Sequence, residues 1–460
     1  MGAGIRVDGR GVAEIAKAAR EFEWTWTRSG VEGFLTQAWP SARISGTDDR
    51  VDHIVFTVAD ARELDEGDCR PALAAALNEV GVELWRLWGA PSGVRVAGEI
   101  GESWTFSKVV VGVTVGERSV DLWLINPAEQ WRLADIEQRA VAEFIASEEW
   151  TTVVAAVGVL AQADPDAWSR TDMDRAFGAV AWALEEDSES GTVRANSGAT
   201  ALCAFRSSEF QRRYGYGEFQ SMWLMARLPE QVLDLAYAAA LAECVRILGT
   251  PSFVGGPKAF ATWRRSATTL MLSRGARLET GLLEMDLYPT EAKENEDYSN
   301  AKWDEDWEPS ECWRIRPDAT TSRADIDGMW FPSDPKATDW ESFDRNVQRL
   351  FASLAADLPV LHPYATGVVW VIVPADEQGF VAQGWFEATR SRVETIEGGE
   401  MVFRDFPPGV AAAEEIIAIT QAAVRVAAEA PDGLRYYAFA TAKPQRLMDF
   451  RLGLADSVDR

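Results

Sequence analysis

The stretch Arg86-Leu87-Trp88-Gly89-Ala90-Pro91-Ser92 recurs about 160 residues later as Arg246-Ile247-Leu248-Gly249-Thr250-Pro251-Ser252. Each copy follows an alanine-rich run of helical composition. The glycine stands where a helix C-cap favours a residue that can adopt a positive φ, and the proline two residues later prevents the helix from continuing. Each copy therefore predicts the end of a helix, and the recurrence predicts an internal duplication.

The sequence after the two stretches also corresponds. A tryptophan, Trp104 or Trp263, is followed by residues that alternate as in a β-strand. A short strand then ends at a proline, over residues 121–127 in one copy and 283–289 in the other. Both copies read as helix, strand, helix, strand, strand. We therefore predict an α+β fold of three tandem domains with antiparallel sheets packed against helices, of which the first two are a duplication.

The predicted domain boundaries follow from these patterns. Residues 1–133 are expected to form the first copy and residues 171–290 the second. Between them, residues 134–170 have apolar side chains at helical spacing and predict a helical connector. Residues 291–338 lack sustained periodicity and are rich in Glu, Asp and Trp, which predicts an exposed acidic linker. Residues 339–460 contain helical and strand patterns of their own and are expected to form the third domain.

The third domain opens with Trp340 and Phe343 on a helix whose leucine-bearing face continues to Leu358. An apolar strand follows over Val368–Val373, and then the segment Phe380–Trp385. Together these features resemble the type III secretion chaperone-like domains of actinobacterial proteins, also called YbjN-like or Tir-chaperone-like domains. The resemblance covers about the last 120 residues. It implies a third domain with a secretion-chaperone-like fold.

The duplicated units have features of another domain class. These are a tryptophan-bearing first helix over Phe22–Trp26, the glycine–proline turn, and a last strand ending in Leu-x-x-x-Pro. They resemble an uncharacterised actinobacterial α/β domain, although the second copy has only Trp182 near the position of the tryptophan pair. The two resemblances imply domains that bind other proteins and have no conserved catalytic centre. Such domains occur in secretion chaperones and near toxin systems, where immunity proteins hold a toxin inactive.

Charge and cysteine content limit the classes of partner and the compartment. The formal net charge is −27 at pH 7 and is spread along the chain, so it would repel a nucleic-acid backbone. No apolar run approaches the length of a signal peptide or a membrane span, so membrane insertion is not expected. The four cysteines, Cys69, Cys203, Cys244 and Cys312, are far apart, as in reduced cytoplasmic proteins. We predict a cytoplasmic protein.

The sequence offers few groups for catalysis. There are only two histidines, His53 within a predicted strand and His362 before a proline, so a Ser/His/Asp, Cys/His or zinc site is not expected. Gly255-Gly256-Pro257-Lys258 lacks the spacing of a phosphate loop and reads as a plain loop. Carboxylates are in surplus, as in Glu185–Asp187 and Asp304–Asp306, but a solvated charged surface is the favoured interpretation. No catalytic residue, cofactor or metal is predicted.

The candidate partner-binding residues lie in the acidic segment. They are three tryptophans and two of the carboxylates around them: Trp303, Asp304, Asp306, Trp307 and Trp313. Aromatic side chains surrounded by charge are typical of protein interfaces, because they contribute a large desolvated contact area. Packing of the same tryptophans against a neighbouring domain explains the pattern equally well.

These observations favour a non-enzymatic, cytoplasmic protein that binds another protein. The leading hypothesis is an immunity protein or secretion chaperone that sequesters a toxin or secreted protein, with the acidic surface attracting a basic partner. Two alternatives stay open. One is a hydrolase that uses paired carboxylates on a glycan, and the other is a structural subunit of a larger assembly.

Overall fold

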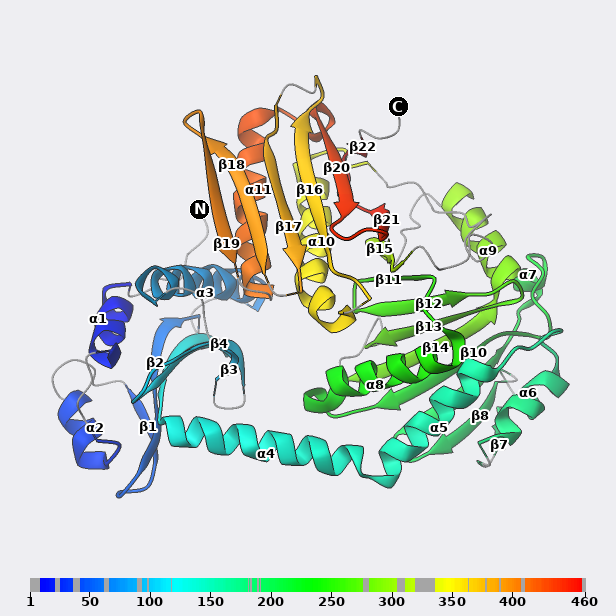
Figure 1. Ribbon diagram of the computed structural model, residues 1–460, viewed down its shortest axis with the longest axis horizontal. Coiled ribbons are helices and arrows are strands. Elements are labelled where there is room, and N and C mark those ends of the chain that lie inside the picture. Colours follow the sequence, from blue (N-terminus) through cyan, green and yellow to red (C-terminus); the bar gives the residue numbers. More distant parts are fainter. Residues whose placement is uncertain are drawn as a thin grey trace. The chain divides into compact units, whose positions relative to one another are not determined.

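The computed structural model describes residues 9–20, 25–35, 42–61, 66–88, 93–96, 99–116, 118–180, 182, 184–187, 190, 192–275, 281–303, 311–318, 336–362, 364–376, 379–388, 390–406 and 410–456. The chain divides into two units, residues 1–142 and residues 143–460. Figure 1 labels their helices and strands. The α+β class predicted from the sequence is confirmed, and each unit is considered by itself below.

The first unit contains a six-stranded antiparallel sheet in the order β1-β2-β6-β5-β4-β3. Its strands are β1 (Arg43–Gly46), β2 (Val51–Asp60), β3 (Gly93–Val96), β4 (Glu99–Thr105), β5 (Val110–Val115) and β6 (Ser119–Ile125). Its helices are α1 (Gly9–Arg20), α2 (Arg28–Leu35) and α3 (Glu66–Trp88), and α4 (Pro127–Ile145) follows β6. Val12, Ile15 and Leu84 from the helices are buried in one core with Ile54 and Leu122 from the sheet.

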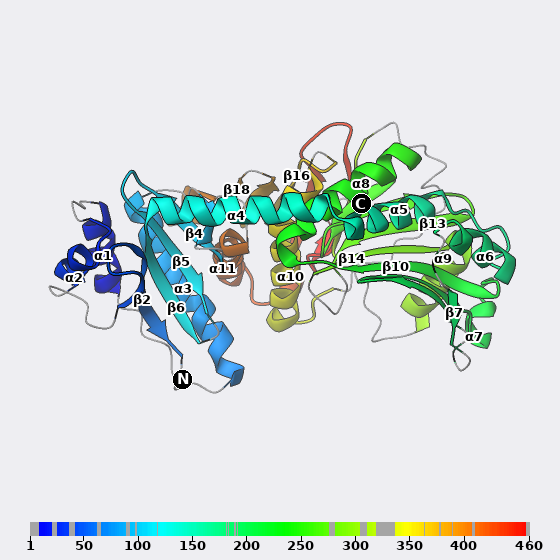
Figure 2. The same cartoon turned by 90° about the horizontal axis from the view of Figure 1, so that it is seen from below.

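The second unit begins with a ten-stranded sheet in the order β21-β15-β11-β12-β13-β14-β10-β9-β8-β7. Its strands are β7 (Leu184–Glu186), β8 (Val193–Ser197), β9 (Thr200–Arg206), β10 (Phe219–Arg227), β11 (Phe253–Gly256), β12 (Phe260–Arg264), β13 (Thr268–Arg274), β14 (Leu282–Pro289), β15 (Trp313–Arg316) and β21 (Arg446–Phe450). Its helices are α5 (Glu148–Gln162), α6 (Arg170–Gly178), α7 (Glu209–Arg212), α8 (Glu230–Leu248) and α9 (Thr290–Trp303). Helices α5 and α8 pack side by side on one face of this sheet (Figure 1 and Figure 2).

Strand connections in these two sheets follow the same order. In each, one strand leads into a long helix, and four strands after the helix form a meander whose last strand pairs with the first strand: β2-α3-β3-β4-β5-β6 and β10-α8-β11-β12-β13-β14. The recurrent stretch ends α3 and α8 at equivalent places, and an ion pair three residues apart precedes each end, Glu83–Arg86 and Glu243–Arg246, both at 2.6 Å. This is what a duplication would produce, and the duplication stays a prediction.

The predicted helix stop is confirmed in the second copy. Gly249 is the C-cap of α8 with φ +81°, and its N–H donates to the Val245 carbonyl at 2.8 Å. The Trp263 Nε1 donates to the Gly249 carbonyl at 2.9 Å, so the tryptophan that follows the stretch holds the cap in place. Gly89, the equivalent residue of the first copy, lies outside the described residues.

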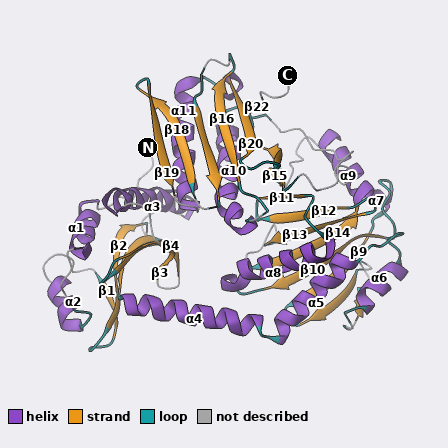
Figure 3. Ribbon diagram, in the orientation of Figure 1, coloured by secondary structure: helices purple, strands orange, loops and turns teal. Residues whose placement is uncertain are grey.

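A third sheet, also in the second unit, has six strands in the order β19-β18-β17-β16-β20-β22. Its strands are β16 (Gly367–Pro374), β17 (Ala382–Glu387), β18 (Ser391–Glu397), β19 (Glu400–Phe406), β20 (Leu434–Ala440) and β22 (Ala455–Asp456). Its pairs are antiparallel except β20 with β22. Helices α10 (Trp340–Leu361) and α11 (Val410–Ala427) pack together on the same side of this sheet (Figure 3). Phe351 of α10 contacts the rings of Trp370 and Phe386, which fixes the face that the helices cover.

The boundaries differ from those expected in two places. The expected connector, residues 134–170, includes α5, whose Val153, Val157 and Leu160 are buried against the ten-stranded sheet. The expected linker, residues 291–338, includes α9 and β15, and β15 lies inside that sheet between β11 and β21. Because β21 comes from the C-terminal part of the chain, the second and third predicted domains share one sheet and form one unit.

Candidate functional site

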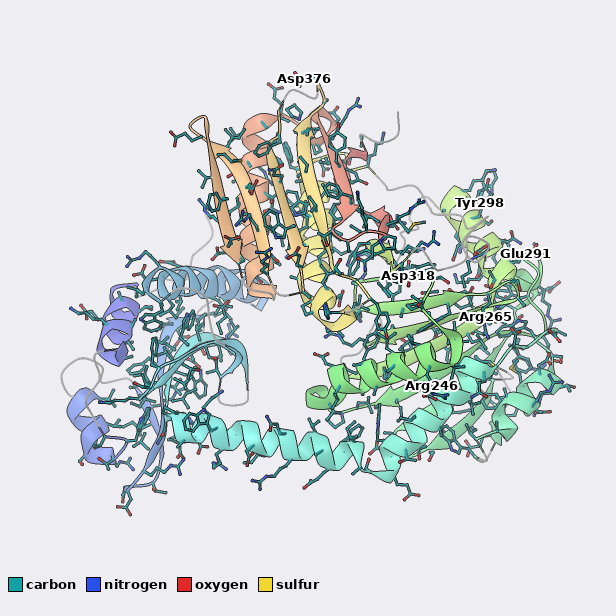
Figure 4. The ribbon with its side chains drawn as sticks, viewed as in Figure 1. Arg246, Arg265, Glu291, Tyr298, Asp318 and Asp376 are labelled. Carbon is teal, nitrogen blue, oxygen red and sulfur yellow. The ribbon has the colours of Figure 1, made fainter. Side chains whose placement is uncertain are left out.

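The predicted partner-binding residues separate in the structure. Trp303 is the last residue of α9 and is 75% exposed, with the Lys302 Nζ lying 4.9 Å from its ring centroid. Tyr298 lies on the same helix (Figure 4). It is 48% exposed. Asp304, Asp306 and Trp307 lie outside the described residues. Of the predicted residues that the structure describes, Trp303 alone is available to a partner.

Carboxylates of the acidic segment hold α9 to the sheet. Glu294 accepts two hydrogen bonds from Arg264 of β12, at 2.6 and 3.0 Å. Glu296 accepts from the Tyr216 hydroxyl at 2.8 Å. This part of the segment was expected to be a solvated linker, but Glu294 and Glu296 are paired with residues of the sheet and the loop before it. The pattern of acidic residues gave no sign of these partners, which lie far away in the sequence.

The prediction that Trp313 contacts a protein partner is wrong. Its side chain is 0% exposed, so it cannot contact another protein in this fold. It lies on β15, and its Nε1 donates to the Ser353 Oγ of α10 at 2.7 Å. The Ser353 hydroxyl in turn donates to the Asp357 Oδ2 at 2.7 Å. We call Trp313, Ser353 and Asp357 the junction cluster, because they join the ten-stranded sheet to α10.

A turn that the sequence presented as a plain loop completes the junction cluster. The backbone N–H groups of Lys258 and Ala259 donate to the Asp357 carboxylate. Both residues have positive φ, 68° and 29°, in the region that L-residues rarely adopt. The glycine-rich turn therefore does bind an anion, but the anion is a carboxylate of the same chain. Sequence reasoning missed Asp357 because nothing near it in the chain marks this contact.

The surroundings of Asp357 make this carboxyl harder to ionise than an exposed one. Burial raises the pKa of Asp357 to about 6, against the opposing effects of the Ser353 hydroxyl and of Arg274, whose Nη2 lies 4.0 Å from the Oδ1. The nearby Tyr237 hydroxyl is buried without a hydrogen-bond partner among the described residues, and burial and the Asp357 charge raise its pKa. With Ser353 and Asp357 only 6% and 1% exposed, a substrate cannot reach this cluster, and we assign it a structural role.

We expect Asp357 to make the stability of the second unit depend on pH. Because the folded-state pKa is raised, the folded state keeps a proton that the unfolded chain releases, so stability present at low pH is lost as pH rises. The free energy of unfolding should fall by about 3 kcal/mol between about pH 4 and pH 6. Burial also raises the pKa values of Asp297, Glu414 and Asp449 in this unit, so urea denaturation across this range should show a smaller fall in Asp357→Asn than in the wild type, by about this amount.

A second variant on the same helix provides a control of opposite sign. Asp339, the N-cap of α10, accepts from the Ser342 N–H at 2.8 Å, and this hydrogen bond lowers its pKa. Asp339 therefore contributes stability that is lost as pH falls, and Asp339→Asn should remove that loss. An Asp357→Asn protein with the same pH profile as the wild type would contradict the assignment of the pKa.

The third sheet presents its other face to solvent. Cross-strand register places a set of side chains on the face away from α10 and α11, and we call this the open face. Its central and outer members are Val369, Val371, Gln383, Trp385, Arg392, Glu394, Ile396, Met401, Phe403, Asp405, Tyr437 and Phe439. Four of them are exposed apolar side chains: Ile396 at 49%, Met401 at 61%, Phe403 at 58% and Phe439 at 52%.

Arg392 organises the centre of the open face. Its guanidinium lies 4.6 Å from the Trp385 ring centroid and 4.9 Å from that of Phe403. It also donates two hydrogen bonds to Asp405, at 2.6 and 2.8 Å, which lower the pKa of that carboxyl. Stacked aromatic and guanidinium groups of this kind are held in one conformation, which reduces the entropy lost when a partner binds.

The groups considered for catalysis remain apart. Glu186 is ion-paired with Arg170 at 2.5 Å and Arg206 at 3.5 Å, as in a charged surface. His53 packs against Trp123 with ring centroids 5.0 Å apart, and His362 is the exposed C-cap of α10. In the part of the chain that the structure describes, no group of three or more His, Cys, Asp or Glu residues could hold a metal ion.

Comparisons with known proteins add one match. Residues 38–126 match a family of unknown function, DUF6301. The match spans the six-stranded sheet of the first unit together with α3. No curated protein and no solved structure matches the chain. Among the described helices, none is both long enough and apolar enough to cross a membrane.

Proposed function

We propose that the chain is a non-enzymatic, cytoplasmic protein that binds another protein through the open face of the third sheet. The observation that carries this proposal is the set of exposed apolar side chains on one continuous sheet face, flanked by charged groups. Large apolar patches rimmed by polar residues are rare on monomeric proteins and usually mark interaction sites. The aromatic side chains and the arginine are also the residue types that dominate binding energy at interfaces.

The charge of the chain supports a basic partner. The net charge of −27 gives a negative field that accelerates association with a positively charged protein and is screened by salt. A protein that captures a basic partner at an apolar surface would act by sequestration. An immunity protein that holds a toxin inactive and a chaperone that holds a protein before secretion are the two forms of this proposal. The exposed Trp303 on α9 provides a second contact for the same partner.

Phe439→Ser should weaken capture of the partner about tenfold or more, because the open face loses a large apolar contact. Phe439 is chosen because it lies on β20, which β16, β17 and β18 separate from the edge strand β19. Its replacement therefore changes the open face without changing that edge. Tagged wild type and variant are used to recover binding proteins from the native cytoplasm, and dissociation constants are then measured with the purified partner.

Val426→Ser is the matched control. Val426 is 90% exposed but lies on α11, outside the open face, so its replacement should leave the affinity unchanged. Raising the ionic strength should slow association of both proteins with the partner. Equal losses from Phe439→Ser and Val426→Ser, or equal capture by both, would place the binding surface elsewhere.

A further inference from the structure

Strand β19 is an open edge of the third sheet. It pairs with β18 over seven residues without a register shift, and its outer side has no partner strand among the described residues. It contains no proline, and both Met401 and Phe403 are more than half exposed. Such edges are templates for pairing with another chain, and proteins normally protect them with bulges, prolines or short strands.

The other sheet edges are protected in these ways. The strands β22 and β7 have two and three residues. The strands β1 and β3 have four residues each, and a register irregularity interrupts the pairing of each with its neighbour. A similar irregularity lies between β15 and β21. Among the described edges, β19 is therefore the long and regular one, and it exposes two large apolar side chains.

The hairpin before β19 determines which backbone groups face outward. Gly398 and Gly399 join β18 to β19 with φ values of +61° and +87°. In a hairpin with a two-residue loop, the residues that flank the loop form a hydrogen-bonded pair. Glu400 and Val402 therefore bond to β18, and the alternating residues Met401 and Phe403 direct their N–H and carbonyl groups away from the sheet.

We propose that β19 pairs with β19 of a second copy of the chain, antiparallel and about a two-fold axis at Val402. Met401 then forms a hydrogen-bonded pair with the partner's Phe403, and both side chains lie on the open face. Glu400 stands opposite the partner's Arg404, so opposite charges meet twice across the axis. Val402 faces the partner's Val402 in a pair without hydrogen bonds. The strand is thus complementary to itself.

Neighbouring registers lack this complementarity. Outward-facing residues alternate along β19 and must meet outward-facing residues of the second copy. The next permitted registers therefore place the two-fold axis one residue to either side, at Met401 or at Phe403. An axis at Phe403 would put Met401 opposite Asp405 and Val402 opposite Arg404. An axis at Met401 would put Glu400 opposite Val402. Both registers separate Glu400 from Arg404 and place a charged side chain against an apolar one, so the axis at Val402 is selected.

The pairing would extend the sheet without changing it. A two-fold axis perpendicular to the strands joins two six-stranded sheets into one of twelve strands, with both open faces on the same side. This inference goes beyond the proposed function and does not depend on it. The self-pairing can be tested with purified protein alone, whereas the proposed function requires a partner.

Cysteine cross-linking tests the register. Cα atoms of a pair without hydrogen bonds lie about 4.5 Å apart, which suits a disulfide. Val402→Cys should therefore form a covalent dimer under mild oxidation. Glu400→Cys alone should not, because the two copies of residue 400 are displaced by four residues, about 13 Å. A mixture of Glu400→Cys and Arg404→Cys should cross-link. A Cys69→Ser background leaves the three native cysteines that are buried.

A charge exchange provides an independent measurement. E400R puts like charges opposite each other twice and should raise the dimer dissociation constant about tenfold, as measured by sedimentation over a dilution series. The double variant E400R/R404E should restore it, which a misfolded protein would not do. A single species of 50.7 kDa at all concentrations, or equal cross-linking of Val402→Cys and Glu400→Cys, would overturn the proposal.

Discussion

Replacing Trp313 by alanine should lower the free energy of unfolding of the second unit by about 3–5 kcal/mol. The side chain is 0% exposed and extends from β15 to α10, where it bonds Ser353. Its removal therefore leaves a large cavity where the sheet meets the helix. The Ser353 hydroxyl also loses the donor on one side while it remains buried. Urea denaturation followed by far-UV circular dichroism measures the change.

Trp303→Ala is the control for this measurement. Trp303 is 75% exposed, and surface substitutions of this kind usually change stability by less than about 0.5 kcal/mol. The two tryptophans were predicted for the same role from the same acidic segment, so the pair separates core packing from partner contact. A small effect of Trp313→Ala, together with a large effect of Trp303→Ala, would show that their assignments are reversed.

Local signals explain what the sequence could predict. A helix stop depends on residues within one turn, so the Gly249 cap was visible in the recurrent stretch. The apolar run over residues 368–373 and the leucine-bearing helix before it can each be recognised within their own segment, and the structure confirms them as β16 and α10. The α+β class followed from the succession of such elements.

Strand β15 shows why the linker was misplaced. It has four residues, too few for alternation to stand out, and two of them are arginines. Its neighbours in the sheet, β11 and β21, lie far away in the sequence on either side. Hydrogen bonding to β11 and β21 and the burial of Trp313 and Ile315 together stabilise this strand. Neither contribution can be predicted from the sequence of the segment alone.

The open face and the junction cluster depend on the same kind of information. Val368 and Val369 are both apolar, so the pattern predicts a strand but not which face the helices cover. The edge position of β19 depends on the order of the strands, and the pKa of Asp357 depends on a turn about 100 residues earlier in the chain. Chemistry that arises from long-range contacts was therefore missed.

Gly256→Ala should destabilise the second unit by about 3 kcal/mol or more, through the same junction cluster. A Cβ at this position would lie 2.2 Å from the Ser353 Oγ, 2.4 Å from the Asp357 Oδ2 and 2.7 Å from the Trp313 Nε1. None of these atoms can move away without breaking a hydrogen bond in a buried site. Gly178→Ala is the control, because a Cβ there meets nothing within 4 Å at the end of α6.

A double-mutant cycle tests whether the cluster is the cause. Ser353→Ala removes the oxygen that the new methyl group would approach most closely, so Gly256→Ala should cost less in that background than in the wild type. A steric conflict with Ser353 predicts a coupling energy of about 1 kcal/mol or more, as for residues in contact. If the two costs simply add, the methyl group acts through the backbone of the turn, and the cluster does not determine which residue can occupy position 256.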